Sequence, residues 1–125
     1  MQGNLREMSL IQILFSFKGR INRGTFWVAS FSAGAVFLIV VLLTFGISSS
    51  AGEGDADPAI IFLIYLIPME WIILAMQVKR WHDRNKSGWM VLIRFIPILG
   101  GLWTLIELGF LPGTIGTNKY GDDPL

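Results

Sequence analysis

The residues best placed for chemistry stand in one short polar stretch, 79–89, between two long apolar runs. It contains the only histidine, followed directly by a carboxylate, as His82-Asp83. Acid–base catalysis would need these side chains to converge with a nucleophile or a metal. A second histidine and any cysteine are absent, so we predict no catalytic residue and no metal site. Asp83 is instead expected to cap a turn or to pair with Arg80 or Arg84, and His82 to bond to the backbone.

Seven of the ten basic residues flank the apolar runs. Guanidinium groups suit phosphate, and each cation beside an anionic leaflet gains about 1 kcal/mol. Such a collar would bind anionic phospholipid or an anionic partner; the alternative is that it only fixes the topology of the chain. Nucleic acid is not expected, because the charges would be held against a lipid surface. The residues are Lys18, Arg20, Arg23, Lys79, Arg80, Arg84 and Lys86.

Glu70 and Arg94 are charged residues inside apolar runs. An ionisable group at membrane depth is costly and usually faces a partner inside the protein. Glu70 lies about 12 Å and Arg94 about 8 Å from the inner ends of their runs at 1.5 Å per residue, so an intramembrane ion pair is feasible. The pair would be a structural tie, or would serve transport or proton relay; otherwise Arg94 would snorkel to the interface.

The composition points to lipid as the solvent of these segments. Of the 125 residues, 53% are hydrophobic and only 15% are charged, which is too few charges for the surface of so small a soluble domain. Runs of about twenty residues match the roughly 30 Å hydrocarbon core. We therefore predict a single all-α domain, 1–125, with transmembrane helices at 27–47, 59–78 and 89–110. Pro97 and Gly100-Gly101 would also permit a re-entrant hairpin in place of the third span.

The segments around these spans are shorter or more polar. Residues 1–17 are expected to form an amphipathic helix, either interfacial or packed on the bundle. A cleaved signal peptide is the alternative to a retained first span, but 27–47 is too long for its apolar region. Residues 48–58 are expected to be an acidic, flexible connector, and 111–125 an irregular tail rich in turn formers.

Orientation follows from the distribution of lysine and arginine in the short loops. Eight of these residues precede the first span or separate the second from the third, whereas one, Lys119, lies in the tail and none lies in the connector. With three spans, this pattern places the N-terminus in the cytoplasm and the C-terminus outside.

Four motifs occur in order along the chain. They are the opening Phe17-Lys18-Gly19-Arg20-Ile21-Asn22-Arg23, the stretch Lys79-Arg80-Trp81-His82-Asp83 with Ser87-Gly88-Trp89, the segment Ile96-Pro97-Ile98-Leu99-Gly100, and the tail from Pro112 to Pro124. In these the chain resembles the domain of unknown function 805 family (YhaH/YhaI type) of small bacterial inner-membrane proteins. The resemblance implies a helical inner-membrane protein, gives His82, Asp83, Ser87, Gly88 and Trp89 a structural motif role, and supplies no catalytic residue.

Together these observations favour a non-enzymatic membrane scaffold or interaction module with no cofactor. Its expected partners are the lipid bilayer, anionic phospholipid included, and a second copy or another membrane protein. The alternative is a small transporter or channel subunit, oligomeric because three spans are few, in which broken helices surround Glu70 and Arg94.

Overall fold

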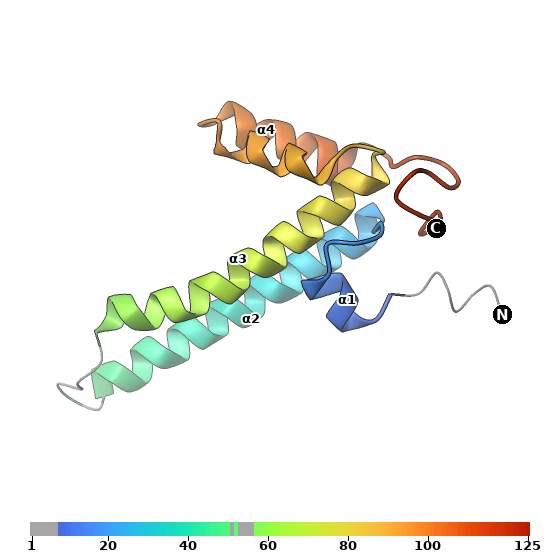
Figure 1. The fold of residues 1–125 in the computed structure, drawn as a ribbon. Helices are drawn as coiled ribbons and strands as arrows, with labels where there is room; N and C mark the ends of the chain where they lie inside the picture. The colour runs from blue at the N-terminus through green and yellow to red at the C-terminus, as the bar shows by residue number, and fades with distance from the viewer. Residues whose placement is uncertain (1–7, 51, 53–56) are drawn as a thin grey trace.

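The computed structural model describes residues 8–50, 52 and 57–125. Within these ranges the secondary structure is helical, apart from one isolated antiparallel bridge between Asn118 and Gly121. A long pair of helices carries a short helix and a folded-back helical hairpin at one end (Figure 1). The all-helical class predicted from the sequence is therefore confirmed for the described part of the chain.

The long pair consists of α2, Arg23–Ser50, and α3, Pro58–Asp83, which lie side by side (Figure 1). Both begin at a polar cap: the Thr25 N–H donates to Asn22 Oδ1 over 2.8 Å, and Ala59 N–H to Asp57 Oδ1 over 2.9 Å. At 1.5 Å per residue they measure about 42 and 39 Å, more than the roughly 30 Å of a bilayer core.

Both helices are long and apolar enough to cross a membrane, and they contain the first two predicted spans. None of the residues of α2 is buried within the protein. A long apolar helix without a buried residue is typical of contact with lipid. The first three residues predicted for the connector, 48–50, belong to α2, while 51 and 53–56 lie outside the described residues.

A short helix, α1, spans Leu10–Phe15 and packs against α3. Ser9 and Gln12 close its first turn in a capping box. Lys79 Nζ then donates to the carbonyl oxygens of Gln12, over 3.1 Å, and Ser16, so a cation meets the negative end of the helix. Residues 1–7 of the predicted helix lie outside the described residues, and the helical part is shorter than expected.

The chain from Gly88 to Phe110 does not form one helix, which corrects the single span predicted over 89–110. It consists of a 3₁₀ helix η2, Gly88–Phe95, then α4, Leu99–Leu105, and a π-helical turn η3, Ile106–Phe110. The two arms run back along each other (Figure 1). At about 2.0 Å per residue η2 measures about 16 Å, and the returning arm about 18 Å, so neither crosses a 30 Å core.

The chain reverses at residues 96–100. Pro97 supplies no backbone donor, so the first arm ends before it. Ile98 adopts a positive φ of 62°, which turns the chain. Gly100 then lies so close to the first arm that a Cβ atom would stand 1.9 Å from the Ile93 carbonyl oxygen. No other residue fits there without moving the two arms apart.

The tail, residues 111–125, lies at the end of the helix pair where α2 begins and α3 ends. Asp83 accepts the Thr114 N–H at its carbonyl oxygen over 2.7 Å, and Asn118 Nδ2 donates to the His82 carbonyl over 2.8 Å. Arg20, just before α2, also contacts the tail. The hairpin thus brings the tail back to the same end of the helix pair as the segment that precedes α2.

Candidate functional site

Asp83 is the centre of a buried polar cluster at this end of the protein. Only 3% of the residue is exposed. Arg20 donates from Nε to its Oδ1 over 3.1 Å, and Arg80 from Nη1 to its Oδ2. A Cβ atom at position 113 would lie 1.9 Å from Oδ2, so the glycine there lets the tail backbone lie directly against the carboxylate.

The remaining donors of Arg20 go to the tail. Its Nη1 donates to the carbonyl oxygens of Gly116, over 2.6 Å, and Gly121, over 3.1 Å, and its Nη2 to that of Thr114 over 2.6 Å. Arginine suits this role because its donors point in fixed directions. This guanidinium therefore holds the tail backbone from Thr114 to Gly121 around itself.

Arg80 likewise donates hydrogen bonds to the backbone of the hairpin. Its Nε donates to the carbonyl of Leu108 and its Nη2 to that of Leu111, each over 2.7 Å, and its Nη1 to that of Ile21 over 3.4 Å. Two buried guanidinium groups thus share one carboxylate, and backbone carbonyl dipoles stabilise the remaining positive charge. Removing one member of such a buried network is strongly destabilising, because it leaves charge uncompensated.

Glu107 is the second carboxylate of the cluster and joins the hairpin to the loop after α3. It accepts from Arg84 Nε over 2.9 Å and from Lys86 Nζ over 2.7 Å, with Trp103 Nε1 at 3.4 Å. Burial acts to raise the pKa of this carboxyl, but the hydrogen bonds from Lys86, Arg84 and Trp103 outweigh it and hold the pKa below its ordinary value. The carboxylate is therefore charged at neutral pH.

His82 lies against the tail and away from both carboxylates. Its ring stacks on Tyr120, with centroids 4.0 Å apart and planes 5° apart. Its Nδ1 lies 3.1 Å from the Gly19 carbonyl oxygen, which only accepts, so this nitrogen carries the proton. The Oδ atoms of Asp83 are held by Arg20 and Arg80 instead, so the His–Asp neighbours in sequence do not act as a pair.

The remaining motif residues start the hairpin. Ser87 accepts the Trp89 N–H at Oγ over 3.3 Å and caps η2. A Cβ atom at Gly88 would lie 2.9 Å from Val78 Cγ1, so this glycine lets η2 begin close to α3. Trp89 itself is 79% exposed, as expected of a side chain at a membrane interface.

The seven predicted collar residues fall into three groups. Arg20, Lys79 and Arg80 are buried and hold backbone carbonyls. Arg84 and Lys86 pair with Glu107. Lys18 and Arg23 are exposed, with Arg23 Nη1 donating to the Phe110 carbonyl over 2.8 Å. The structure therefore does not bring all seven together on one surface, and only Lys18 and Arg23 are exposed to solvent.

Glu70 and Arg94 lie together on α3 and η2. Arg94 Nη2 donates to both oxygens of Glu70, over 3.1 and 2.8 Å. The side chains are 40% and 20% exposed, respectively, so the pair sits at the edge of the interface between α3 and the hairpin. This ion pair therefore connects the second half of η2, nearer the tip of the hairpin, to α3.

Three features of the cluster were not predicted from the sequence. No role was assigned to Glu107 from the sequence, although an unexplained charge in an apolar run is itself a signal for a buried partner. The acceptors that hold Arg20 in the tail are backbone carbonyls, which every residue has, so no residue type could indicate them. Gly113 lies within the tail motif, but its contact with Asp83 depends on the fold.

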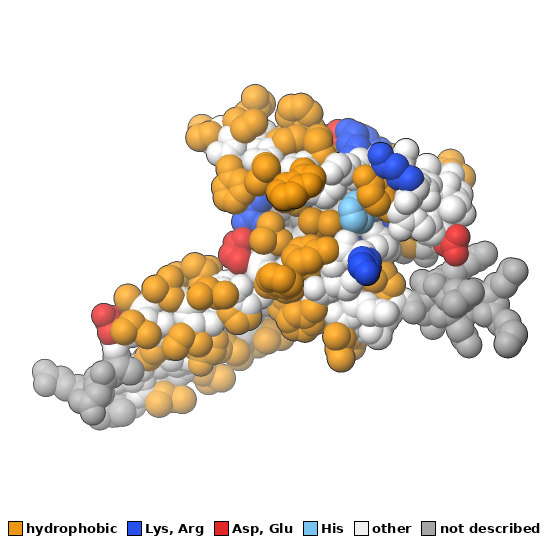
Figure 2. Space-filling view, in the orientation of Figure 1, with side chains coloured by type: hydrophobic (Ala, Val, Ile, Leu, Met, Phe, Trp, Pro, Cys, Tyr) orange, Lys and Arg blue, Asp and Glu red, His pale blue; other side chains and the backbone are white. Residues whose placement is uncertain are grey.

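The charged groups of the cluster are already paired with one another or with backbone carbonyls. Its carboxylates face cations, and its cations face carboxylates and carbonyls. Within residues 8–50, 52 and 57–125 no three of His, Asp and Glu gather as metal ligands would. The cluster connects α3, the hairpin and the tail to one another. Figure 2 shows apolar side chains over the helix pair and hairpin, with the histidine and several cations beside the tail.

Fold and cluster together define a class: a small helical chain with two helices able to cross a membrane and a hairpin fastened to their common end. Residues 14–122 match the family described as "Protein of unknown function (DUF805)", and the chain belongs to that family. This confirms the resemblance drawn from its four motifs.

Several proteins of Escherichia coli K12 are similar along nearly their whole length. "Uncharacterized protein YiiR" is 36% identical, covering 93% of this chain and 90% of its own. "Inner membrane protein YhaI" is 28% identical, covering 94% and 92%, and "Inner membrane protein YhaH" is 29% identical, covering 94% and 93%. No solved structure gives a significant match. The family has no known activity, so none carries over to this chain.

Proposed function

We propose that this protein is a non-enzymatic scaffold of the bacterial inner membrane. The observation that carries the proposal is the use of the motif residues: Arg20, Arg80 and Asp83 are engaged in fastening the hairpin and the tail to the helix pair. A site built for turnover would leave a nucleophile, a base or a metal position open to a substrate. This cluster instead stabilises a shape at one end of the bundle.

The membrane placement supports this role. YhaI and YhaH are named inner membrane proteins, and α2 and α3 have the length and composition of spans. The excess of lysine and arginine lies at the end where α2 begins and α3 ends, which supports a cytoplasmic position for that end. The tail joins it there, and the hairpin enters about half of the bilayer from the same side.

The tail offers the surface that such a scaffold would present. Its backbone is fixed by Arg20, and Gly116 N–H donates to Asp123 Oδ2 over 2.8 Å. Ile115 projects from this fixed loop with 95% of its surface exposed. A rigid loop with an exposed apolar tip is suited to docking against another protein, because little conformational entropy is lost on binding.

The test is site-specific photo-crosslinking in native membranes. A photoreactive residue at Ile115 is expected to give a discrete protein adduct, whereas one at Phe31, exposed on α2, should give lipid adducts. Asp83→Asn, which releases the tail from Arg20, should remove the adduct at Ile115. Lipid adducts alone at both positions would contradict the scaffold role.

A transporter or channel subunit built on Glu70 and Arg94 is the second candidate. The partly exposed pair favours it, because an ion pair at the edge of the contact between α3 and the hairpin is available to a substrate. Ion or proton flux through liposomes containing the purified protein, lost in Glu70→Gln, would support this function over the scaffold.

A further inference from the structure

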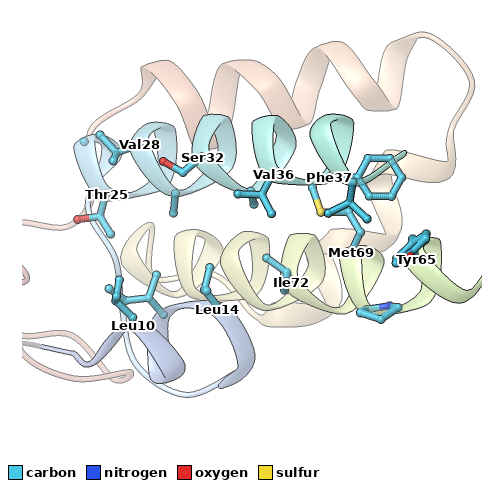
Figure 3. A pocket seen from close by; sticks show the side chains of 16 residues that line it. Leu10, Leu14, Thr25, Val28, Ser32, Val36, Phe37, Tyr65, Met69 and Ile72 are labelled. Atoms are coloured by element: carbon cyan, nitrogen blue, oxygen red, sulfur yellow. The ribbon is translucent and has the colours of Figure 1, made fainter. Parts of the chain in front are cut away.

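The two interfaces of α3 differ in polarity. Beside α1 and α2, α3 borders a groove that is lined mainly by apolar side chains, among them Leu14, Val36 and Ile72 (Figure 3). Between α3 and the hairpin, in contrast, polar side chains are buried, and four of their atoms have no hydrogen-bond partner within the described part of the chain. These atoms are Gln77 Oε1, Trp81 Nε1, Arg94 Nη1 and Thr104 Oγ1. Buried polar atoms of native proteins nearly always have a partner, so a group of four requires an explanation.

Trp81 locates the first of these atoms in the hydrophobic core between α3 and the hairpin. Its side chain is fully buried and packs with Val91 of η2 and Leu108 of η3. Side chains on a helix lean towards its N-terminus, so the indole leans along α3 towards Gln77, four residues earlier. Residues four apart lie on the same helix face, and the two side chains are therefore neighbours.

The hairpin contributes the other two side chains close to the same core. Arg94 follows Val91 by three residues, which is one turn of the 3₁₀ helix η2, so both lie on one face of it. Thr104 precedes Leu108 by four residues, about one helical turn, and only 7% of it is exposed, so it faces the interior that Leu108 faces. The arms run in opposite directions, so both steps lead from the core towards the tip of the hairpin (Figure 1).

The corresponding step on α3 leads in the same direction. Glu70 lies further along α3 towards its N-terminus and accepts from Arg94 Nη2, near the hairpin tip. The step from Trp81 to Gln77 has that same direction. Gln77, Arg94 and Thr104 thus each stand one turn beyond the core on the tip side, and the Trp81 indole leans towards them. These four residues form a polar layer that lies against the buried side of the Glu70–Arg94 pair.

We propose that this polar layer binds water between α3 and the hairpin. A water molecule donates and accepts, so it can serve both the Trp81 indole N–H, which only donates, and the Gln77 carbonyl oxygen, which only accepts. Buried waters typically make about three such bonds. Water beside Arg94 Nη1 would also solvate the buried side of the Glu70–Arg94 pair, which lowers the cost of a charged pair at membrane depth. The site is independent of the scaffold and transporter functions proposed above.

The experiment is NMR of the full chain in nanodiscs with ¹⁵N-labelled tryptophan, which gives one indole signal for each of the five tryptophans. Trp81→Phe identifies the Trp81 signal. We expect magnetisation transfer from water to the Trp81 indole, although this side chain is fully buried. Trp27, whose Nε1 donates to the Gly109 carbonyl over 2.9 Å, should receive several-fold less.

Two substitutions of similar volume test the polar partners. Thr104→Val and Gln77→Leu should each reduce the transfer several-fold and lower the Tm by a few degrees, because the remaining polar atoms lose the bonds of a shared water. Thr25→Val, on α2 outside the layer, is the matched control and should change neither. Gln77→Leu, at a partly exposed position, covers the case in which Thr104→Val does not fold.

The sign of the Tm change separates bound water from atoms that have no partner at all. A higher Tm for both substitutions would overturn the proposal, because an apolar group in place of an unsatisfied polar atom is stabilising. So would the absence of transfer to the Trp81 indole. Transfer lost in Thr104→Val but kept in Gln77→Leu would overturn the shared water as well, because the Thr104 hydroxyl alone would then pass protons to the indole.

Discussion

Arg20 and Asp83 stand 63 residues apart in the sequence, yet Arg20 Nε donates to Asp83 Oδ1 over 3.1 Å in the buried interior. Arg20 precedes α2, Asp83 ends α3, and the guanidinium also holds three carbonyls of the tail. One ionic contact thus connects the start, the middle and the end of the chain. The motif residues are best understood as parts of this connection.

Asp83→Asn tests the connection directly. The amide would leave Arg20 and Arg80 buried without a counter-charge, so we expect a loss of about 3–5 kcal/mol, together with faster proteolysis of the tail. The measurement is thermal or denaturant unfolding in detergent. Asp57→Asn is the control, since asparagine caps a helix as well as aspartate and this residue is exposed. Equal effects of the two changes would contradict the central role of Asp83.

Gly100→Ala and Gly101→Ala test the hairpin with neighbouring residues. The added methyl at 100 would collide with the Ile93 carbonyl, so overpacking should cost about 1–3 kcal/mol and separate the two arms. At 101 no atom lies within 4 Å of the new methyl, and the change should be neutral or stabilise the helix slightly. Distances between spin labels on the two arms would follow the separation. Two neutral changes would mean that the arms are not packed as described.

Glu70 and Arg94 should be energetically coupled. Glu70→Gln or Arg94→Met alone leaves a charge without its partner, whereas the double change replaces both, so the double mutant should lose less than the sum of the single losses. We expect a coupling of about 0.5–3 kcal/mol, in the lower part of that range because the pair is partly exposed. A double-mutant cycle on unfolding in nanodiscs measures it. Strict additivity would show that the pair does not form in a bilayer.

The ion pairs of Glu107 should make the stability of the folded protein depend on pH in the acid range. Because the pKa of its carboxyl is below the ordinary value in the folded state, it contributes stability above the unfolded pKa of about 4.3. That contribution is lost as the pH falls through the folded pKa. The difference in Tm between wild type and Glu107→Gln should therefore be constant near neutral pH and shrink below about pH 4.3. A difference that stays constant down to pH 3 would contradict the prediction.

The contact between the tail and Arg20 predicts where the C-terminus lies. The tail lies beside Arg20, at the end of the helix pair that we propose to be cytoplasmic. A green fluorescent protein fused after Leu125 should therefore fluoresce, and alkaline phosphatase at the same position should be inactive. The matched fusion is phosphatase at Gly52, between α2 and α3, which should be active. Phosphatase activity after Leu125 would restore a third full span.

The sequence alone determined the two long helices. Runs 27–47 and 59–78 predicted membrane-length helices, and α2 and α3 contain both. Such runs are readable because a helix in lipid satisfies its own backbone and needs only local apolar length. Residue types and order were likewise enough for the family, whose match covers residues 14–122.

The tertiary structure decided the rest. The run 89–110 has the length of a span, but Pro97, the positive φ of Ile98 and the close approach at Gly100 turn it into a hairpin. That reversal brings the tail back to Arg20 and Asp83 and decides which cations are buried. Hairpin and kinked helix differ little in local preference, so contacts between residues far apart in sequence choose between them. Backbone carbonyls, which every residue has, supply most of those contacts, so residue identity could not reveal them.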